Sequence, residues 1–178
     1  MLSRSDAAGS VRLAKSEDMP SWGQIHSAAM RKDLHSHLGQ VDPQTLALIN
    51  SGEITKAWTQ SLLSPPSPKH HLLTAVNNGQ VVGMAAIAPA PTMLAKPKQS
   101  PLAQREADSE IVALEVTDWE KNLDDASRLL HAIVDMLRLS GASRVQIWLA
   151  AGGKEKNPVL FRMRIFSGRS ASGLAGGA

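Results

Sequence analysis

The sequence has no cysteine, no tyrosine and only two phenylalanines among 178 residues. Without cysteine the chain has no disulfide, no thiol nucleophile and no thiolate metal ligand. Without tyrosine it has no phenolic general acid. The longest apolar run, residues 81–90, is too short to span a bilayer, and the first 15 residues lack the apolar core of a signal peptide. We therefore expect a cytoplasmic protein with no membrane contact.

The composition that remains is typical of one globular domain. Hydrophobic residues make up 43% and charged residues 20%, and the net charge of +3 is mildly basic. Lys and Arg are scattered along the chain, so nucleic-acid binding stays a weak alternative. Both ends are rich in small and polar residues. We expect a flexible N-terminus over 1–9, a single domain over 10–168 and a flexible tail over 169–178.

Hydrophobic periodicity predicts an α/β (α+β) domain with a mixed β-sheet flanked by helices. Asn78-Gly79 predicts a tight hairpin turn. Ser16 is a candidate helix N-cap, and Asp42-Pro43 starts a second helix that Gly52 would end. The expected strands are 10–14, 71–76, 80–88, 109–116 and 143–150, and the later expected helices are 54–63, 126–137 and 157–166.

The region 109–150 predicts a strand, a crossover helix and a second strand. Such a unit places its two strands parallel with a right-handed connection. The first strand carries two acids, Glu110 and Glu115, which are five residues apart. Strict alternation would put their side chains on opposite faces of the sheet.

Two histidine pairs and one tryptophan are candidates for ligand binding. His35 and His37 form an H-x-H, and His70 and His71 are adjacent, but neither pair has the further converging ligands that a metal needs. We expect no metal site. Trp119 belongs either to the core or to the wall of a ligand slot.

Three segments resemble the GNAT superfamily of acyl-CoA-dependent N-acyltransferases over roughly 10–168. They are "VRLAKSEDMPSW", the hairpin "LLTAVNNGQVVGMAAIAP" and the segment that begins "SEIVALEVTDWEKNLDDASRLL". The resemblance implies a mixed sheet with acetyl-CoA as co-substrate. It also implies transfer of an acetyl (acyl) group to a primary amine of a small molecule or peptide.

In the family the third segment reads L-x-V-x-P, then Arg/Gln-x-x-G-x-G/A, then a leucine-rich helix. Leu114 and Val116 match, whereas Asp118 stands in place of Pro. The resemblance implies that the backbones of Glu115 and Val116 line the pantetheine, and that the helix start holds the pyrophosphate. The residues implied in cofactor binding are Glu115, Val116, Lys121, Asn122, Leu123, Asp124, Asp125, Ala126, Ser127 and Asn157.

The expected pyrophosphate loop departs from the family at its glycines. Asn122, Asp124 and Ala126 occupy those positions. A carboxylate at Asp124 would cap the helix, occupy the N–H groups that a phosphate uses and repel the phosphate. Lys121 and Arg128 would compensate in part.

The catalytic groups implied by the resemblance are incomplete. Glu110 falls where some members place a general base, and the alternative is a solvated carboxylate at a strand edge. The family's tyrosine acid is replaced by Arg164. The chain ends ten residues after Gly168, which is too short for the family's last two strands. Either the sheet lacks them, another chain completes it, or the tail is not an intact domain end.

The main hypothesis is therefore a GNAT-type N-acetyltransferase. The alternative is a catalytically inactive GNAT-derived domain that acts as a binding module or homodimer through an open sheet edge. The lost glycines, the lost tyrosine and the short C-terminal region motivate that alternative.

Overall fold

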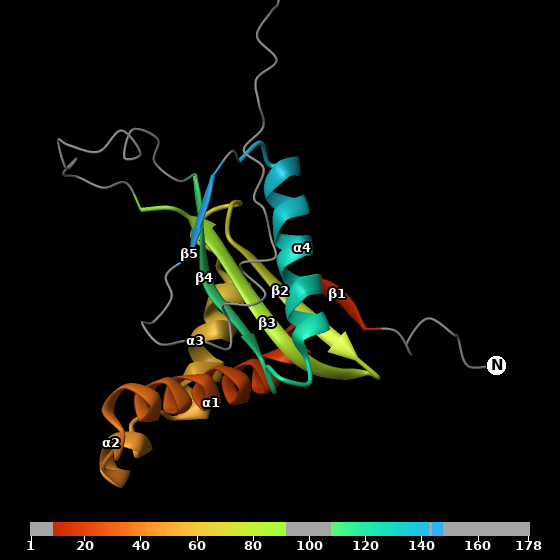
Figure 1. Ribbon diagram of the computed structural model, residues 1–178. Helices are drawn as coiled ribbons and strands as arrows, with labels where there is room; N and C mark the ends of the chain where they lie inside the picture. The colour runs from red at the N-terminus through yellow and green to blue at the C-terminus, as the bar shows by residue number, and fades with distance from the viewer. Residues whose placement is uncertain (1–8, 92–107, 143, 148–178) are drawn as a thin grey trace, which may run out of the picture.

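The computed structural model describes residues 9–91, 108–142 and 144–147. They form a five-stranded sheet in the order β1-β2-β3-β4-β5 with helices on both faces (Figure 1). The strands are β1 (Ser10–Leu13), β2 (His71–Asn77), β3 (Gln80–Pro89), β4 (Ser109–Val116) and β5 (Val145–Ile147). The helices are α1 (Met19–Leu38), α2 (Pro43–Ala47), α3 (Ser51–Leu63) and α4 (Leu123–Leu139), and a short 3-10 turn, η1 (Ser16–Asp18), precedes α1.

The strand pairing confirms the expected mixed sheet. β1 to β4 pair antiparallel in sequence order, and β5 pairs parallel to β4 after the crossover through α4. The β2–β3 hairpin turns at Asn78 and Gly79, whose φ angles of 49° and 74° are both positive. A positive φ is tolerated by Asn and Gly, which is why this dipeptide predicts the turn.

Two apolar clusters hold the helices to opposite faces of the sheet (Figure 1). On one face α4 packs with Leu129, Ile133 and neighbouring residues against β2, β3 and β4. On the other face Trp22 and Ile25 of α1 pack against β3 and β4. β3 lies at the centre and is covered on both sides, as its almost continuous apolar run predicts.

Close backbone approach explains two of the glycines. A Cβ on Gly23 would lie 2.0 Å from Thr55 Oγ1 and 2.5 Å from the Ser51 carbonyl oxygen, so glycine lets α1 touch α3. A Cβ on Gly83 would lie 2.9 Å from Val116 Cγ1, so glycine lets neighbouring side chains lie over β3.

Some expected element boundaries are wrong. Gly52 does not end the second helix, because α2 ends at Ala47 and Gly52 lies in the first turn of α3, which Asn50 caps. Ser16 is not the N-cap residue, because η1 begins there and its N-cap position is Lys15. The expected helix 157–166, including Arg164 and Asn157, and the expected tail 169–178 lie outside the described residues, so the expected lack of the family's last two strands stays a prediction.

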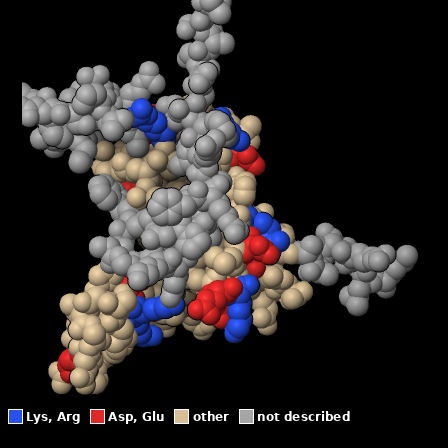
Figure 2. All heavy atoms as spheres, in the orientation of Figure 1, with Lys and Arg blue, Asp and Glu red and all other residues tan. Residues whose placement is uncertain are grey.

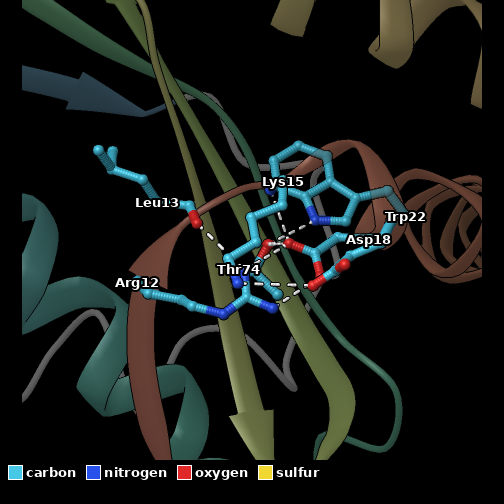
Figure 3. A network of polar contacts seen from close by, with 7 residues as sticks. Arg12, Leu13, Lys15, Asp18, Trp22 and Thr74 are labelled. Atoms are coloured by element: carbon cyan, nitrogen blue, oxygen red, sulfur yellow. Dashed lines mark hydrogen bonds and ion pairs between the residues drawn. The ribbon is translucent and has the colours of Figure 1, made fainter.

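A buried polar network joins the start of α1 to the sheet (Figure 3). Asp18 is only 2% exposed, and its two carboxylate oxygens accept hydrogen bonds from Arg12 at 2.6 and 2.8 Å. Asp18 also accepts from the Lys15 backbone N–H at 2.8 Å and from the Thr74 hydroxyl at 3.0 Å. Trp22 donates from Nε1 to the same hydroxyl at 3.0 Å. Two strands and one helix therefore share a single carboxylate.

Ionisation of Asp18 favours folding. Burial acts to raise the pKa of Asp18, but the hydrogen bonds from Arg12, Lys15 and Thr74 outweigh burial and lower this pKa below its usual value of 3.8. A lowered folded-state pKa contributes stability above the unfolded-state value. That contribution is lost as the pH falls below 3.8 and through the folded-state pKa.

We predict that Asp18→Asn lowers the free energy of unfolding by about 2 to 3 kcal/mol at neutral pH, because it removes a buried partner of Arg12. Urea unfolding monitored by tryptophan fluorescence measures this loss. The mutant's stability should also fall less steeply than the wild type's on acidification.

Glu17→Gln is the matched control for this prediction. Its side chain is 71% exposed and its ion pair with Lys15 spans 3.5 Å, so the substitution should change little. Equal losses in the two mutants would show that the Asp18 network does not stabilise the fold.

Candidate functional site

A β-bulge shifts the register in the middle of β4. Ala113 pairs with Ala86 on β3, but Ile111 pairs with the next residue, Ile87, so Val112 has no partner of its own in the ladder. The Val112 side chain is 56% exposed although both neighbouring residues are buried. A residue inserted in this way reverses the alternation of side chains beyond it.

The bulge corrects the expected placement of the two strand acids. Glu110 pairs with Ala88, and Glu115 pairs with Met84. Ala88 and Met84 are four residues apart on β3 and therefore share a face. Glu110 and Glu115 consequently lie on the same face, the one covered by α1, and not on opposite faces.

The two acids have different surroundings on that face. Glu110 is half-buried near the start of β4, where Gln146 of β5 donates a long hydrogen bond of 3.4 Å to its carboxylate. Glu115 is 7% exposed near the end of β4 and lines a cavity. The structure therefore places Glu115 beside a cavity, whereas the sequence pattern implied a role only for its backbone. The bulge that turns it inward has no marker in the sequence.

The cavity has a volume of about 580 Å³ and lies between α1 and the end of β4 with its following loop. Ile25, Val81 and Trp119 contribute apolar wall. Trp119 is 6% exposed and packs into the core under α4, so its core role is confirmed and it also borders this cavity.

The loop between β4 and α4 is organised by Asp118. Its Oδ1 accepts hydrogen bonds from the backbone N–H groups of Glu120 at 3.1 Å and Lys121 at 3.3 Å. The Lys121 ammonium lies 3.1 Å from Oδ2. Lys121 lowers the Asp118 pKa from its usual 3.8, through a side-chain hydrogen bond first and a backbone hydrogen bond second. An aspartate thus does engage backbone donors of this loop, but it is Asp118, at the position of the family's proline.

The aspartates at the start of α4 have different roles from those expected. The N-cap residue is Asn122, and its side chain donates to Thr117 Oγ1 at 3.0 Å without capping the helix. Asp124 is exposed in the first helical turn and does not occupy the cap position. Asp125 is 2% exposed and turned toward the sheet, where it contacts Arg128 at 2.6 Å and Asn77 at 3.1 Å. The described side chains therefore leave the first N–H groups of α4 open to a ligand.

The remaining predicted cofactor residues occupy the same helix start. Leu123 is exposed, Ala126 is fully buried and Ser127 is half-buried. The structure thus brings together Lys121 through Ser127 at one junction, with Glu115 and Val116 at the strand end beside it. Asn157 lies outside the described residues.

The histidine pairs and the surface charges were the other candidates in the part of the chain that the structure describes. Among residues 9–91, 108–142 and 144–147, no three His, Asp or Glu side chains are placed to hold a metal ion. No helix in these ranges is long and apolar enough to cross a membrane. On the face shown in Figure 2, basic and acidic residues lie next to each other instead of forming one basic patch.

Several solved structures with a similar fold are described as N-acetyltransferases. No family model matches the sequence, and no curated protein matches it. An N-acetyltransferase from Staphylococcus aureus superimposes with a TM-score of 0.60 at 17% identity, over 87% of this chain and 81% of that one. A GCN5-related N-acetyltransferase from Ralstonia eutropha has a TM-score of 0.60 at 13% sequence identity, over 96% of this chain and 99% of that one. The PaiA N-acetyltransferase from Thermoplasma acidophilum, solved in complex with coenzyme A, has a TM-score of 0.60 at 8% sequence identity, over 87% of each chain.

The chain has the GNAT N-acetyltransferase fold. This agrees with the resemblance seen in the opening strand, the hairpin and the strand–loop–helix segment. At these identities the agreement concerns the fold, and the chemistry must be argued from the residues of the site.

We predict that Asp125→Ala destabilises the protein by about 2 kcal/mol, because it removes a buried carboxylate that accepts two side-chain hydrogen bonds. Asp124→Ala is the neighbouring control, and its exposed side chain should change stability by less than about 0.5 kcal/mol. Thermal and urea unfolding of both variants measure the difference. A larger loss for Asp124→Ala would mean that Asp124 is the structural cap after all.

Proposed function

We propose that the protein is an N-acetyltransferase that moves an acetyl group from acetyl-CoA to a primary amine of a small-molecule or peptide acceptor. The observation that carries this proposal is the junction of β4, its loop and the uncapped start of α4 on a GNAT fold. The coenzyme A complex of the Thermoplasma neighbour supports the choice of co-substrate.

The edge of β4 supports a binding path for the pantetheine arm. The Thr117 backbone N–H donates to the Val82 carbonyl at 2.9 Å. Backbone groups of an antiparallel strand alternate in direction, so those of Glu115 also face β3. The backbone groups of Val116 and Leu114 then face the opposite edge. In our proposal Val116 therefore contacts the pantetheine together with Leu114, and Glu115 contributes its side chain to the site.

The start of α4 supports a place for the pyrophosphate. N–H groups at a helix N-terminus and the positive end of its dipole attract anions. We assign this contact to the segment from Lys121 to Ser127, with the Lys121 side chain as the nearby cation. Lys121 is 83% exposed, so it can turn from Asp118 to a phosphate at small cost.

The proposed reaction is direct transfer between two bound substrates. The lone pair of the neutral amine attacks the thioester carbonyl, the C–S bond breaks, and the amide and free coenzyme A are formed. Glu110 takes the proton that the amine must lose, directly or through water. The thiolate recovers a proton from water, because no tyrosine exists in the chain to donate one.

The first test of this function is calorimetric titration with acetyl-CoA and, in parallel, with coenzyme A. We expect dissociation constants in the micromolar range or below. Lys121→Glu should weaken both by about tenfold or more, since it replaces an attractive charge at the phosphates with a repulsive one.

Lys56→Glu is the control for the charge reversal. Lys56 is an exposed residue of α3 that pairs with Glu53 at 2.7 Å, so its reversal should leave the affinity unchanged. If millimolar acetyl-CoA and coenzyme A gave no heat and no thermal shift, the acetyltransferase hypothesis would be rejected. The inactive binding module would then be the remaining hypothesis.

A second test addresses Glu110. Glu110→Gln should lower kcat by about 10²-fold or more at neutral pH, a typical effect of losing a general base. The dissociation constant of acetyl-CoA should not change. If the mutant's loss of rate vanishes at high pH, where the amine is already neutral, the assignment is supported; an unchanged kcat at neutral pH would refute it.

A further inference from the structure

The loop before α4 carries a carboxylate at the place where the proposed function needs positive charge. Asp118 Oδ1 accepts hydrogen bonds from the backbone N–H groups of Glu120 at 3.1 Å and Lys121 at 3.3 Å, and the Lys121 ammonium lies 3.1 Å from Oδ2. One carboxylate therefore engages both the backbone and the side chain of Lys121. The proposed function assigns this same lysine to the pyrophosphate of acyl-CoA.

A carboxylate and a phosphate make the same kind of contact with such a loop. Both are anions with several acceptor oxygens, and both take charge-assisted hydrogen bonds from ammonium and backbone N–H groups. Lys121 lowers the pKa of Asp118 from its usual 3.8, through a side-chain hydrogen bond first, so Asp118 is ionised at neutral pH. The carboxylate then offsets the lysine charge and repels a second anion that approaches.

The exposure of this ion pair makes it easy to exchange. The Lys121 side chain is 83% exposed and that of Asp118 is 40% exposed, so water can replace either partner. Exposed ion pairs of this kind contribute little to stability. The Asp118 carboxylate also keeps its two backbone donors when the lysine side chain turns away. The contact therefore suits a competitor for Lys121 and not a fixed structural lock.

We infer that Asp118 is an internal competitor of the pyrophosphate, which holds Lys121 in the free protein and releases it when acyl-CoA binds. This rests on the proposed function, in which Lys121 is the cation at the phosphates. The consequence is that Asp118 limits the affinity for the coenzyme. Removing its charge should make the protein a tighter binder.

The test is calorimetric titration of Asp118→Asn with coenzyme A. The amide oxygen of asparagine can still accept the two backbone N–H groups, so the variant removes the charge and keeps the turn. We expect the dissociation constant to fall about three- to tenfold relative to the wild type, because Lys121 is freed and a repulsive charge is lost. Damage to the loop would weaken binding, so a gain in affinity cannot come from misfolding.

Two controls identify the source of the gain. Glu120→Gln removes the same charge from an exposed side chain of the same loop, and it should change the affinity by less than about twofold. Asp118→Asn is also measured in a Lys121→Gln background. There its gain should shrink, because the lysine for which the two anions compete is absent.

The outcomes separate the inference from the proposed function. An affinity of Asp118→Asn that is unchanged, weaker or no tighter than that of Glu120→Gln would overturn the inference and leave the enzyme proposal standing. An equal gain with and without Lys121 would do the same, since it would show general repulsion and not competition for the lysine. If neither the wild type nor Asp118→Asn bound coenzyme A, the proposed function itself would fail, and the inference with it.

Discussion

The carboxylate of Asp18 fixes the position of the first helix, and the site depends on that position. Arg12 on β1 and Thr74 on β2 both bind this carboxylate, and the Lys15 backbone N–H closes the turn that leads into α1. Trp22, one turn into α1, joins the same network through Thr74. A shift of this helix start would move the wall that α1 contributes to the cavity. The polar network is therefore the link between the stability of the N-terminal half and the shape of the site.

The order of elements could be predicted from the sequence because it rests on local signals. Alternation and apolar runs predict the strands, the Asn78-Gly79 dipeptide predicts the hairpin, and the spacing of Leu129 and Ile133 predicts the helix that covers one face. These signals depend on neighbours in the chain. The parallel pairing of β4 and β5 then follows from the helical crossover between them.

The site could be predicted less well because it depends on one inserted residue and on side-chain partners distant in the sequence. Val112 looks like any strand valine, yet its bulge brings Glu115 onto the face of Glu110. The sequence suggests a cap at Asp124, yet it is the next residue, Asp125, that is buried, where Asn77 of β2 donates to it. Neither effect leaves a local pattern. The strand–loop–helix junction can therefore be predicted from the sequence, whereas the faces and the partners of its carboxylates cannot.

The partners of these carboxylates also determine which cation is available to a phosphate. Arg128 lies near the start of α4, but it is paired at 2.6 Å with Asp125, whose side chain is 3% exposed. Turning Arg128 away would leave a buried carboxylate without its ion-pair partner, which is costly. Lys121 is paired at 3.1 Å with Asp118, whose side chain is 40% exposed, so water can replace the lysine there. The two pairs look equivalent in sequence, but burial makes Arg128 a structural residue and leaves Lys121 as the cation that a pyrophosphate can recruit.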